Sequence, residues 1–199
     1  PTALTDDKNN TAVANSVFVD GADVYVAGYV VGADNNEATL WKNGKPTLLS
    51  GNSPEANAKA VYVAGSDVYV AGYQKEGDKV VPQLWKNGKA VTLKASQYDT
   101  FVQSLFDAGS DVYMVGYEDV KGKPKATLLK NGEPTSLTDG SSDMAIAFDV
   151  KVEGEDVYAS GFDGSKAILW KNGKPTEYSN DEKNACVNSV FIVKREVTK

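Results

Sequence analysis

Two aspartates, Asp107 and Asp149, stand in segments that read as the innermost strands of two neighbouring copies of an internal repeat. Glycoside hydrolysis requires a pair of carboxylates flanking the bond that breaks. Two acids are a narrow basis for such a site, and the chain contains no histidine. Because histidine is absent, the chain lacks the commonest general base, cannot form a Ser-His-Asp triad and offers no imidazole metal ligand.

The same segments carry polar residues at one repeat position, which we call the inner polar set: Asn15, Lys59, Gln103 and Asn188. The remaining copy has Phe148 there. The neighbouring position is small in all copies but one: Ser16, Ala60, Ser104, Asp149 and Ser189. Amide and ammonium groups in innermost strands could hydrogen-bond a polar ligand or face only water. We treat the inner polar set as candidate ligand-binding residues.

A second candidate group is aromatic in every copy, and we call it the aromatic set: Tyr29, Tyr73, Tyr117 and Phe162. Each residue ends the second strand of its copy. Aromatic rings at a rim could stack on a sugar ring or a protein side chain, whereas rings kept in every copy also suit packing between repeats. Packing is the prediction for Trp41, Trp85 and Trp170, which recur within the third strand.

Other residues receive structural predictions. The first residue of each "DVY" motif lies in a Gly-containing turn, where aspartate bonds nearby backbone N–H groups: Asp23, Asp67, Asp111 and Asp156. Acidic loops such as "TDDKNN" and "DGSSD" lack the spacing of a calcium loop, so neither a metal nor a cofactor is expected. Cys186 is the one cysteine, and we expect a small buried hydrophobe rather than a reactive thiol.

Composition excludes several classes of protein. The net charge of −6 disfavours nucleic acid, whose phosphates demand a basic surface. No apolar run approaches the roughly 18 residues of a membrane-spanning helix. With 41% hydrophobic and 24% charged residues, the 199-residue chain is expected to fold as one soluble globular domain over residues 1–199.

Two sequence markers keep one period. The "DVY" motif begins at Asp23, Asp67, Asp111 and Asp156, in steps of 44, 44 and 45 residues. The "KNG" motif begins at Lys42, Lys86, Lys130 and Lys171, in steps of 44, 44 and 41 residues. Enrichment in valine, tyrosine and threonine favours strands, and Asn-Gly is the strongest signal of a tight hairpin. Units of this length with four antiparallel strands predict the blades of a β-propeller.

The units span approximately residues 14–49, 58–93, 102–137 and 147–178. Within the first unit we expect strands at 15–19, 23–29, 38–42 and 46–49. Residues 1–4 match a fourth strand and residues 188–193 match a first strand, and both lack the rest of their unit. Propellers often close by combining terminal strands in one blade, so we predict five blade positions, with four blades as the alternative.

The motifs "SVFV", "DVYVAGY" and "LWKNGKPT" carry a family resemblance. The sequence resembles tandem "VYVAGY…LWKNG" repeat proteins, which are secreted or lipid-anchored in Gram-negative bacteria, and its strand order also resembles NHL-type propeller blades. The resemblance covers essentially the whole chain. It implies a propeller in the periplasm or outside the cell, and it implies no known chemistry. Leu129 departs from the pattern, since it replaces the tryptophan of the third unit.

Function is expected on the rim that carries the divergent loops. Connections between the second and third strands, and between successive units, vary most and emerge on one rim. The sequence therefore predicts a monomeric, non-catalytic binding or scaffold module of the bacterial surface or periplasm, with a glycan or protein ligand on that rim. The alternative is an enzyme, a glycoside hydrolase or lyase with its site on the propeller axis.

Overall fold

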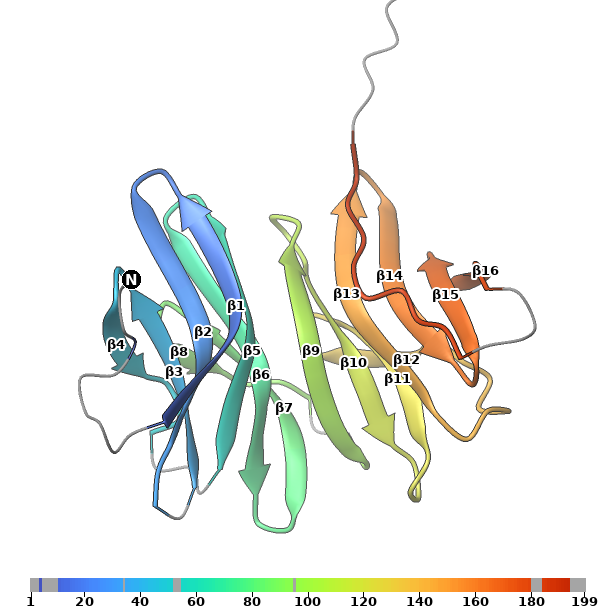
Figure 1. The fold of residues 1–199 in the computed structure, drawn as a ribbon, viewed down its shortest axis with the longest axis horizontal. Helices are drawn as coiled ribbons and strands as arrows, with labels where there is room; N and C mark the ends of the chain where they lie inside the picture. The colour runs from blue at the N-terminus through green and yellow to red at the C-terminus, as the bar shows by residue number, and fades with distance from the viewer. Residues whose placement is uncertain are drawn as a thin grey trace, which may run out of the picture.

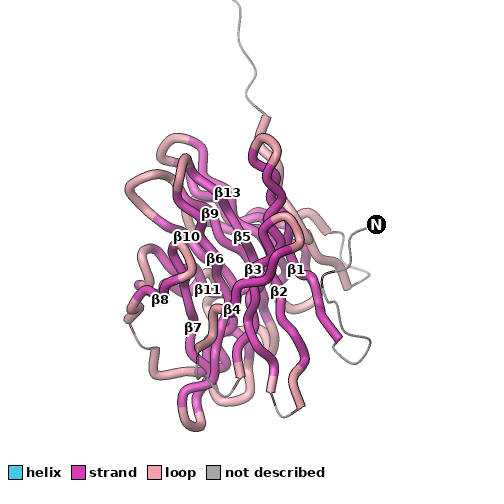
Figure 2. Tube along the Cα trace, turned by 90° about the vertical axis from the view of Figure 1, so that its left-hand side faces the viewer, coloured by secondary structure: helices cyan, strands magenta, loops and turns pink. Residues whose placement is uncertain are grey.

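The computed structural model describes residue 4 and residues 11–33, 35–51, 55–94, 96–179 and 184–193. Within these ranges the chain forms sixteen β-strands in four sheets. No helix there is long and apolar enough to cross a membrane. Each sheet pairs four antiparallel strands in chain order, and the sheets stand side by side (Figures 1 and 2). The predicted propeller architecture of four-stranded antiparallel blades is confirmed.

We name the sheets blades 1 to 4 in chain order. Blade 1 consists of β1 (Thr11–Asp20), β2 (Asp23–Val31), β3 (Asn36–Lys42) and β4 (Lys45–Leu48). Blade 2 consists of β5 (Ala56–Ala64), β6 (Asp67–Glu76), β7 (Lys79–Lys86) and β8 (Lys89–Val91). Blade 3 consists of β9 (Asp99–Asp107), β10 (Val112–Asp119), β11 (Pro124–Lys130) and β12 (Glu133–Ser136). Blade 4 consists of β13 (Ala145–Glu153), β14 (Asp156–Asp163), β15 (Lys166–Lys171) and β16 (Lys174–Glu177).

The two sequence markers, "DVY" and "KNG", contact each other within each blade, which explains why they recur with nearly the same period. In blade 2, Asn87 Nδ2 donates to Asp67 Oδ1 at 2.8 Å, and Lys86 Nζ lies 2.7 Å from Asp67 Oδ2. Asn87 has a φ of 52°, which the first residue of a type I′ Asn-Gly turn requires. The other blades repeat both contacts at corresponding residues. The four "DVY" aspartates thus tie one turn to the next.

Successive blades bury one apolar cluster at each interface. The first strand of each blade packs on the second and third strands of the blade before it. Trp41, Trp85 and Trp170 are at most 1% exposed, which agrees with their predicted packing role. Leu129, at the tryptophan position of blade 3, is also buried. The core is therefore a series of neighbour-to-neighbour contacts.

A glycine in each second strand faces a β-bulge in the first strand. The register of β5 with β6 shifts between Ala58 and Ala60, which leaves Lys59 as the extra residue. A Cβ on Gly72 would lie 1.9 Å from the carbonyl oxygen of Asn57. Blades 1, 3 and 4 repeat this arrangement. Only glycine leaves room for the bulged backbone, and this explains the glycine of "VYVAGY".

The described residues form four sheets and no fifth sheet. This number agrees with the four-blade alternative. Residues 184–193 run along blade 4 without forming a strand (Figure 1), where Val187 N donates to the carbonyl oxygen of Gly161 at 3.0 Å. The carbonyl oxygen of Leu4 accepts a hydrogen bond from Trp41 Nε1 at 2.8 Å. The remainder of the predicted orphan strand at residues 1–4 lies outside the described residues.

The first blade of the series exposes apolar side chains. Val17 and Val19 are 63% and 62% exposed, whereas the corresponding Val61 and Val63 of blade 2 are 6% and 8% exposed. Blade 1 has no complete blade before it to cover these positions. Cys186 is exposed, so the expectation of a buried thiol is wrong: no sheet covers residues 184–193.

Candidate functional site

The innermost strands enclose a cavity of about 410 Å³, which we call the axial pocket. Side chains of β1, β5, β9 and β13 line it, together with Asn188 and Ser189. All four members of the inner polar set lie in this lining, as does Phe148. The structure thus brings together the residues that the repeat comparison singled out.

The β-bulge explains why these side chains meet. A bulge places two consecutive residues of one strand opposite a single residue of its partner. Lys59 and Ala60 therefore both line the axial pocket, and Asn15 and Ser16 do so in blade 1. The innermost strand presents more side chains to the axis than a regular strand would.

Asp149 is a buried carboxylate with both oxygens occupied. Its Oδ1 accepts hydrogen bonds from Ser104 Oγ at 2.9 Å and from Lys151 Nζ at 2.8 Å. Its Oδ2 accepts from Ser189 Oγ at 2.8 Å and from Val190 N at 3.1 Å. Burial raises the pKa of Asp149, but these bonds outweigh burial and hold the pKa below its ordinary value. The group is ionised and fixed in position.

Lys59 is half-buried and lacks a carboxylate partner among the described residues. Its Nζ lies 5.7 Å from the centroid of the Tyr73 ring, within the range of a cation–π contact. Burial lowers the pKa of Lys59. Lys151 differs, since it pairs with Asp149. The pocket therefore holds one neutralised and one unneutralised ammonium group.

The two aspartates that the sequence analysis weighed as a carboxylate pair do not meet in the axial pocket. Asp149 lines the pocket and Asp107 does not. Asp107 Oδ1 is buried without a hydrogen-bond partner, and burial raises the pKa of this carboxyl. Asp149 is the one carboxylate in the described lining. Asp107 and Asp149 therefore do not form the pair of axial acids that a glycosidase site would need.

The aromatic set lies outside the axial pocket, and one of its ring contacts, that of Tyr73, crosses a blade interface. Tyr73 contacts Phe101 of blade 3 edge-on at 5.1 Å, and Phe101 stacks on Tyr117 at 4.7 Å. Phe162 lies 5.7 Å from Phe148. Burial, with smaller contributions from neighbouring charges, raises the pKa of Tyr73 to about 12. Contacts of this kind serve packing, although all four rings stay half-buried.

The sequence comparison missed an aromatic column inside the pocket. Phe18 contacts Tyr62 at 5.1 Å, and Tyr62 contacts Phe106 at 5.0 Å. Phe18 and Tyr62 line the axial pocket. These residues share one repeat position, where blade 4 has Lys151. The aromatic residue of the repeated "SVFV" pattern was visible in the sequence. The bulge that decides whether its side chain faces the pocket was not.

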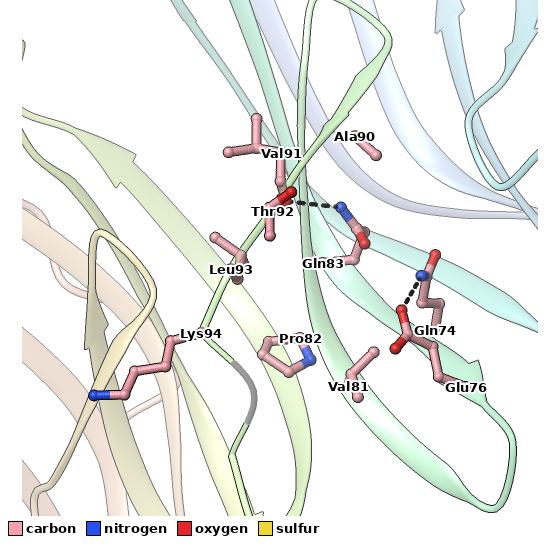
Figure 3. Close-up of a pocket in the computed structure, with 10 residues that line it drawn as sticks. All are labelled: Gln74, Glu76, Val81, Pro82, Gln83, Ala90, Val91, Thr92, Leu93 and Lys94. Carbon is pink, nitrogen blue, oxygen red and sulfur yellow. Dashed lines mark hydrogen bonds between the residues drawn. The ribbon is translucent and has the colours of Figure 1, made fainter.

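Three further cavities lie away from the axis. The varying rim loops form one of about 290 Å³ near Asn35 and Glu55, and another of about 340 Å³ near Asp139 and Lys166. A third, of about 310 Å³, lies on strands β6 to β8 and the residues that follow (Figure 3). There Gln83 Nε2 donates to the carbonyl oxygen of Leu84 at 2.7 Å, so much of its polar lining already bonds within the chain.

Comparison with known proteins identifies the fold. No family model and no curated protein matches the sequence. A GH43_12 protein retrieved from a capybara gut metagenome matches in structure with a TM-score of 0.53 and 12% identity over 83% of this chain. A thermostable family-43 glycoside hydrolase matches with a TM-score of 0.54 and 13% identity over 87% of this chain. This chain spans 41% of the first protein and 74% of the second.

These neighbours correct the functional expectation. The sequence predicted a non-catalytic binding or scaffold module and no enzyme. Both solved structures named above are glycoside hydrolases, and this finding runs against the prediction of a non-catalytic module. At this identity the likeness establishes the fold alone.

Proposed function

We propose that the protein cleaves glycosidic bonds and that its substrate enters the axial pocket. The observation that carries the proposal is the gathering of the inner polar set around one cavity on the propeller axis. The pocket volume of about 410 Å³ falls within the range of small-molecule sites. The fold shared with family-43 glycoside hydrolases supports the same activity.

The lining matches the surface of a sugar. Amides such as Gln103 and Asn188 offer both donors and acceptors to ring hydroxyls. Phe18, Tyr62 and Phe148 offer apolar faces on which the C–H side of a sugar ring can pack. Polar and aromatic groups therefore line the same cavity.

Asp149 is the charged group best placed to assist the chemistry. A glycosidase transition state resembles an oxocarbenium ion, and a fixed carboxylate stabilises positive charge that develops beside it. Asp149 is ionised and held by serine, lysine and backbone donors. Hydrolysis by paired acids needs a second carboxyl about 5–10 Å away, and the described lining contains none.

Elimination is the second candidate reaction. A lyase needs no pair of carboxylates: a base takes the proton from the ring carbon next to the sugar's carboxyl group, a C=C bond forms, and the glycosidic oxygen leaves and takes up a proton. The observation that favours it is the lining charge, since the described pocket holds two lysines and one aspartate. Hydrolysis and elimination leave different products, so one assay separates them.

We also propose the family, the monomeric state and the location that the sequence predicted. The protein belongs to the "VYVAGY…LWKNG" repeat family, acts as a monomer and works in the periplasm or outside the cell, where glycan polymers are found. The rim cavities near Asn35 and Asp139 hold parts of the polymer beyond the axial pocket. Exposed edges of the aromatic set add stacking contacts there.

The test incubates the purified protein with a panel of neutral and acidic polysaccharides. New reducing ends report cleavage, and ultraviolet absorbance of an unsaturated sugar reports elimination. Gln103→Ala should reduce the rate about tenfold through a lost hydrogen bond. The control Gln97→Ala changes an exposed residue outside the pocket and should leave the rate unchanged. Absence of cleavage across the panel would refute the proposal.

A further inference from the structure

Lys59 is a half-buried cation whose charge the described protein leaves unneutralised. Removing an ammonium group from water costs free energy unless an anion replaces the lost solvation. The direction of its pKa agrees, because burial lowers the pKa of Lys59 and no neighbouring carboxylate raises it. Lys59 Nζ lies 5.7 Å from the centroid of the Tyr73 ring.

The axial pocket is positive inside an acidic protein. Its described lining contains Lys59, Lys151 and Asp149 as charged residues. Lys151 and Asp149 form an ion pair at 2.8 Å and cancel, so Lys59 leaves a net positive charge. The chain as a whole carries −6. A positive cavity within a negative molecule concentrates anions at one place.

Hydrogen-bond donors accompany this charge. Gln103 belongs to the neighbouring blade and lines the same cavity, and its side chain forms no hydrogen bond among the described residues. Asn15 Nδ2, by contrast, already donates to the carbonyl oxygen of Ala58 at 2.8 Å. Asn188 accepts a hydrogen bond from Cys186 Sγ through its Oδ1, so among the described residues Lys59, Gln103 and Asn188 Nδ2 are the groups of the inner polar set with N–H donors free to meet a ligand anion.

We propose that the axial pocket selects a sugar bearing a carboxylate, a uronic acid, and that Lys59 is the residue that determines this specificity. The proposal rests on the proposed function and names its substrate class. Lys59 Nζ pairs with the sugar carboxylate, Gln103 Nε2 donates to it, and the aromatic column packs against the ring. A carboxylate in a partly desolvated site forms a charge-assisted hydrogen bond about twice as strong as a neutral one.

The test compares each uronate oligosaccharide with its own methyl ester, which removes the charge and keeps the skeleton. Oligomers of galacturonate, glucuronate and mannuronate serve as probes, and calorimetry measures Kd. Lys59→Met removes the charge and retains the apolar stem. Lys59→Arg retains the charge. Lys89→Met is the matched control, because Lys89 is exposed on β8 and outside the pocket.

Wild type should bind at least one acid about tenfold more tightly than its ester. Lys59→Met should abolish this preference, whereas Lys59→Arg and Lys89→Met should retain it. Lys59→Met is expected to fold, since an apolar group is tolerated where an unpaired cation was buried, and circular dichroism checks this.

Two outcomes overturn the inference in distinguishable ways. If the esters or neutral polysaccharides bind as well as the acids, and Lys59→Met changes neither, the uronic acid specificity is wrong while glycan cleavage stands. If no acidic or neutral glycan is bound or cleaved, the proposed function itself fails and the specificity fails with it.

Discussion

Gly72 and Asn57 approach so closely that a Cβ on the glycine would lie 1.9 Å from the asparagine carbonyl oxygen. The contact faces the bulge that turns Lys59 toward the axial pocket. A residue in the second strand therefore controls which side chains the first strand presents to the axis. The same pairing recurs in every blade, at Gly28, Gly116 and Gly161.

Gly72→Ala should destabilise the protein by about 3 kcal/mol, because backbone must move to admit the methyl group. Gly65→Ala is the control: nothing lies within 4 Å of its Cβ position, but its φ is +59°. That change should cost only about 1–2 kcal/mol, for the left-handed backbone. Denaturant unfolding measures both free energies. Equal costs would show that the bulge tolerates a side chain.

Asp149→Asn should destabilise the fold by about 3 kcal/mol at neutral pH, since it leaves the Lys151 ammonium without its partner. The folded-state pKa of Asp149 lies below its ordinary 3.8. Its stabilising contribution is therefore complete above pH 3.8 and is lost as pH falls through the folded pKa. The gap in unfolding free energy between wild type and Asp149→Asn should narrow on acidification.

The control for this pH series is Asp143→Asn. Asp143 pairs with Lys123, but its side chain is 90% exposed. Solvent screens such a pair, so the substitution should leave stability unchanged within error. If the two variants give the same pH profile, Asp149 does not anchor the axial pocket.

Asn87→Ala should cost about 1–2 kcal/mol, because alanine at a φ of 52° is strained and two hydrogen bonds to the next turn are lost. Lys86→Met removes the exposed ion pair with Asp67 and the contact of Lys86 Nζ with the Tyr69 ring, both weak at the surface, and should shift the unfolding midpoint very little. Thermal denaturation compares the two. A larger loss from Lys86→Met would mean that the charge, rather than the Asn-Gly geometry, holds the turn.

Two valines at the same repeat position should respond differently to threonine. Val61 is 6% exposed, and Val61→Thr buries a hydroxyl at a cost of about 1–3 kcal/mol. Val17 is 63% exposed, and Val17→Thr should change stability by less than about 0.5 kcal/mol. Chemical unfolding of both variants is the measurement. A comparable loss at Val17 would contradict an uncovered face on blade 1.

Most of the fold could be predicted from the repeat period. The Asn-Gly turns could be predicted because the positive φ values that they require are set within the turn itself. The "DVY" aspartates were recognised as turn residues from the glycine nearby, but the contact of Asp67 with Asn87 joins residues 20 apart in the chain. The inner polar set was also found from sequence, since comparing copies isolates a position without knowledge of its contacts. The packing role of the three tryptophans was predicted from their recurrence at one repeat position alone.

What escaped prediction depends on register and on neighbours far along the chain. The bulge beside Lys59 is a property of two paired strands, so no local pattern reveals it. The charge state of the axial pocket depends on Asp149 meeting Lys151, Ser104 and Ser189. Asp107 stands three residues beyond Ser104, the counterpart of Asp149 in its own copy, and it lies outside the pocket.

The uncovered face of blade 1 has a consequence for how the molecule comes apart. Each blade packs only on its neighbours along the chain, so the described blades resemble a short repeat array, whose stability is a sum of units and interfaces. Blades 2 and 3 have an interface on both sides, and blade 1 has one. Opening should begin at blade 1, and amide hydrogens of β1 and β2 should exchange before those of β6 and β10.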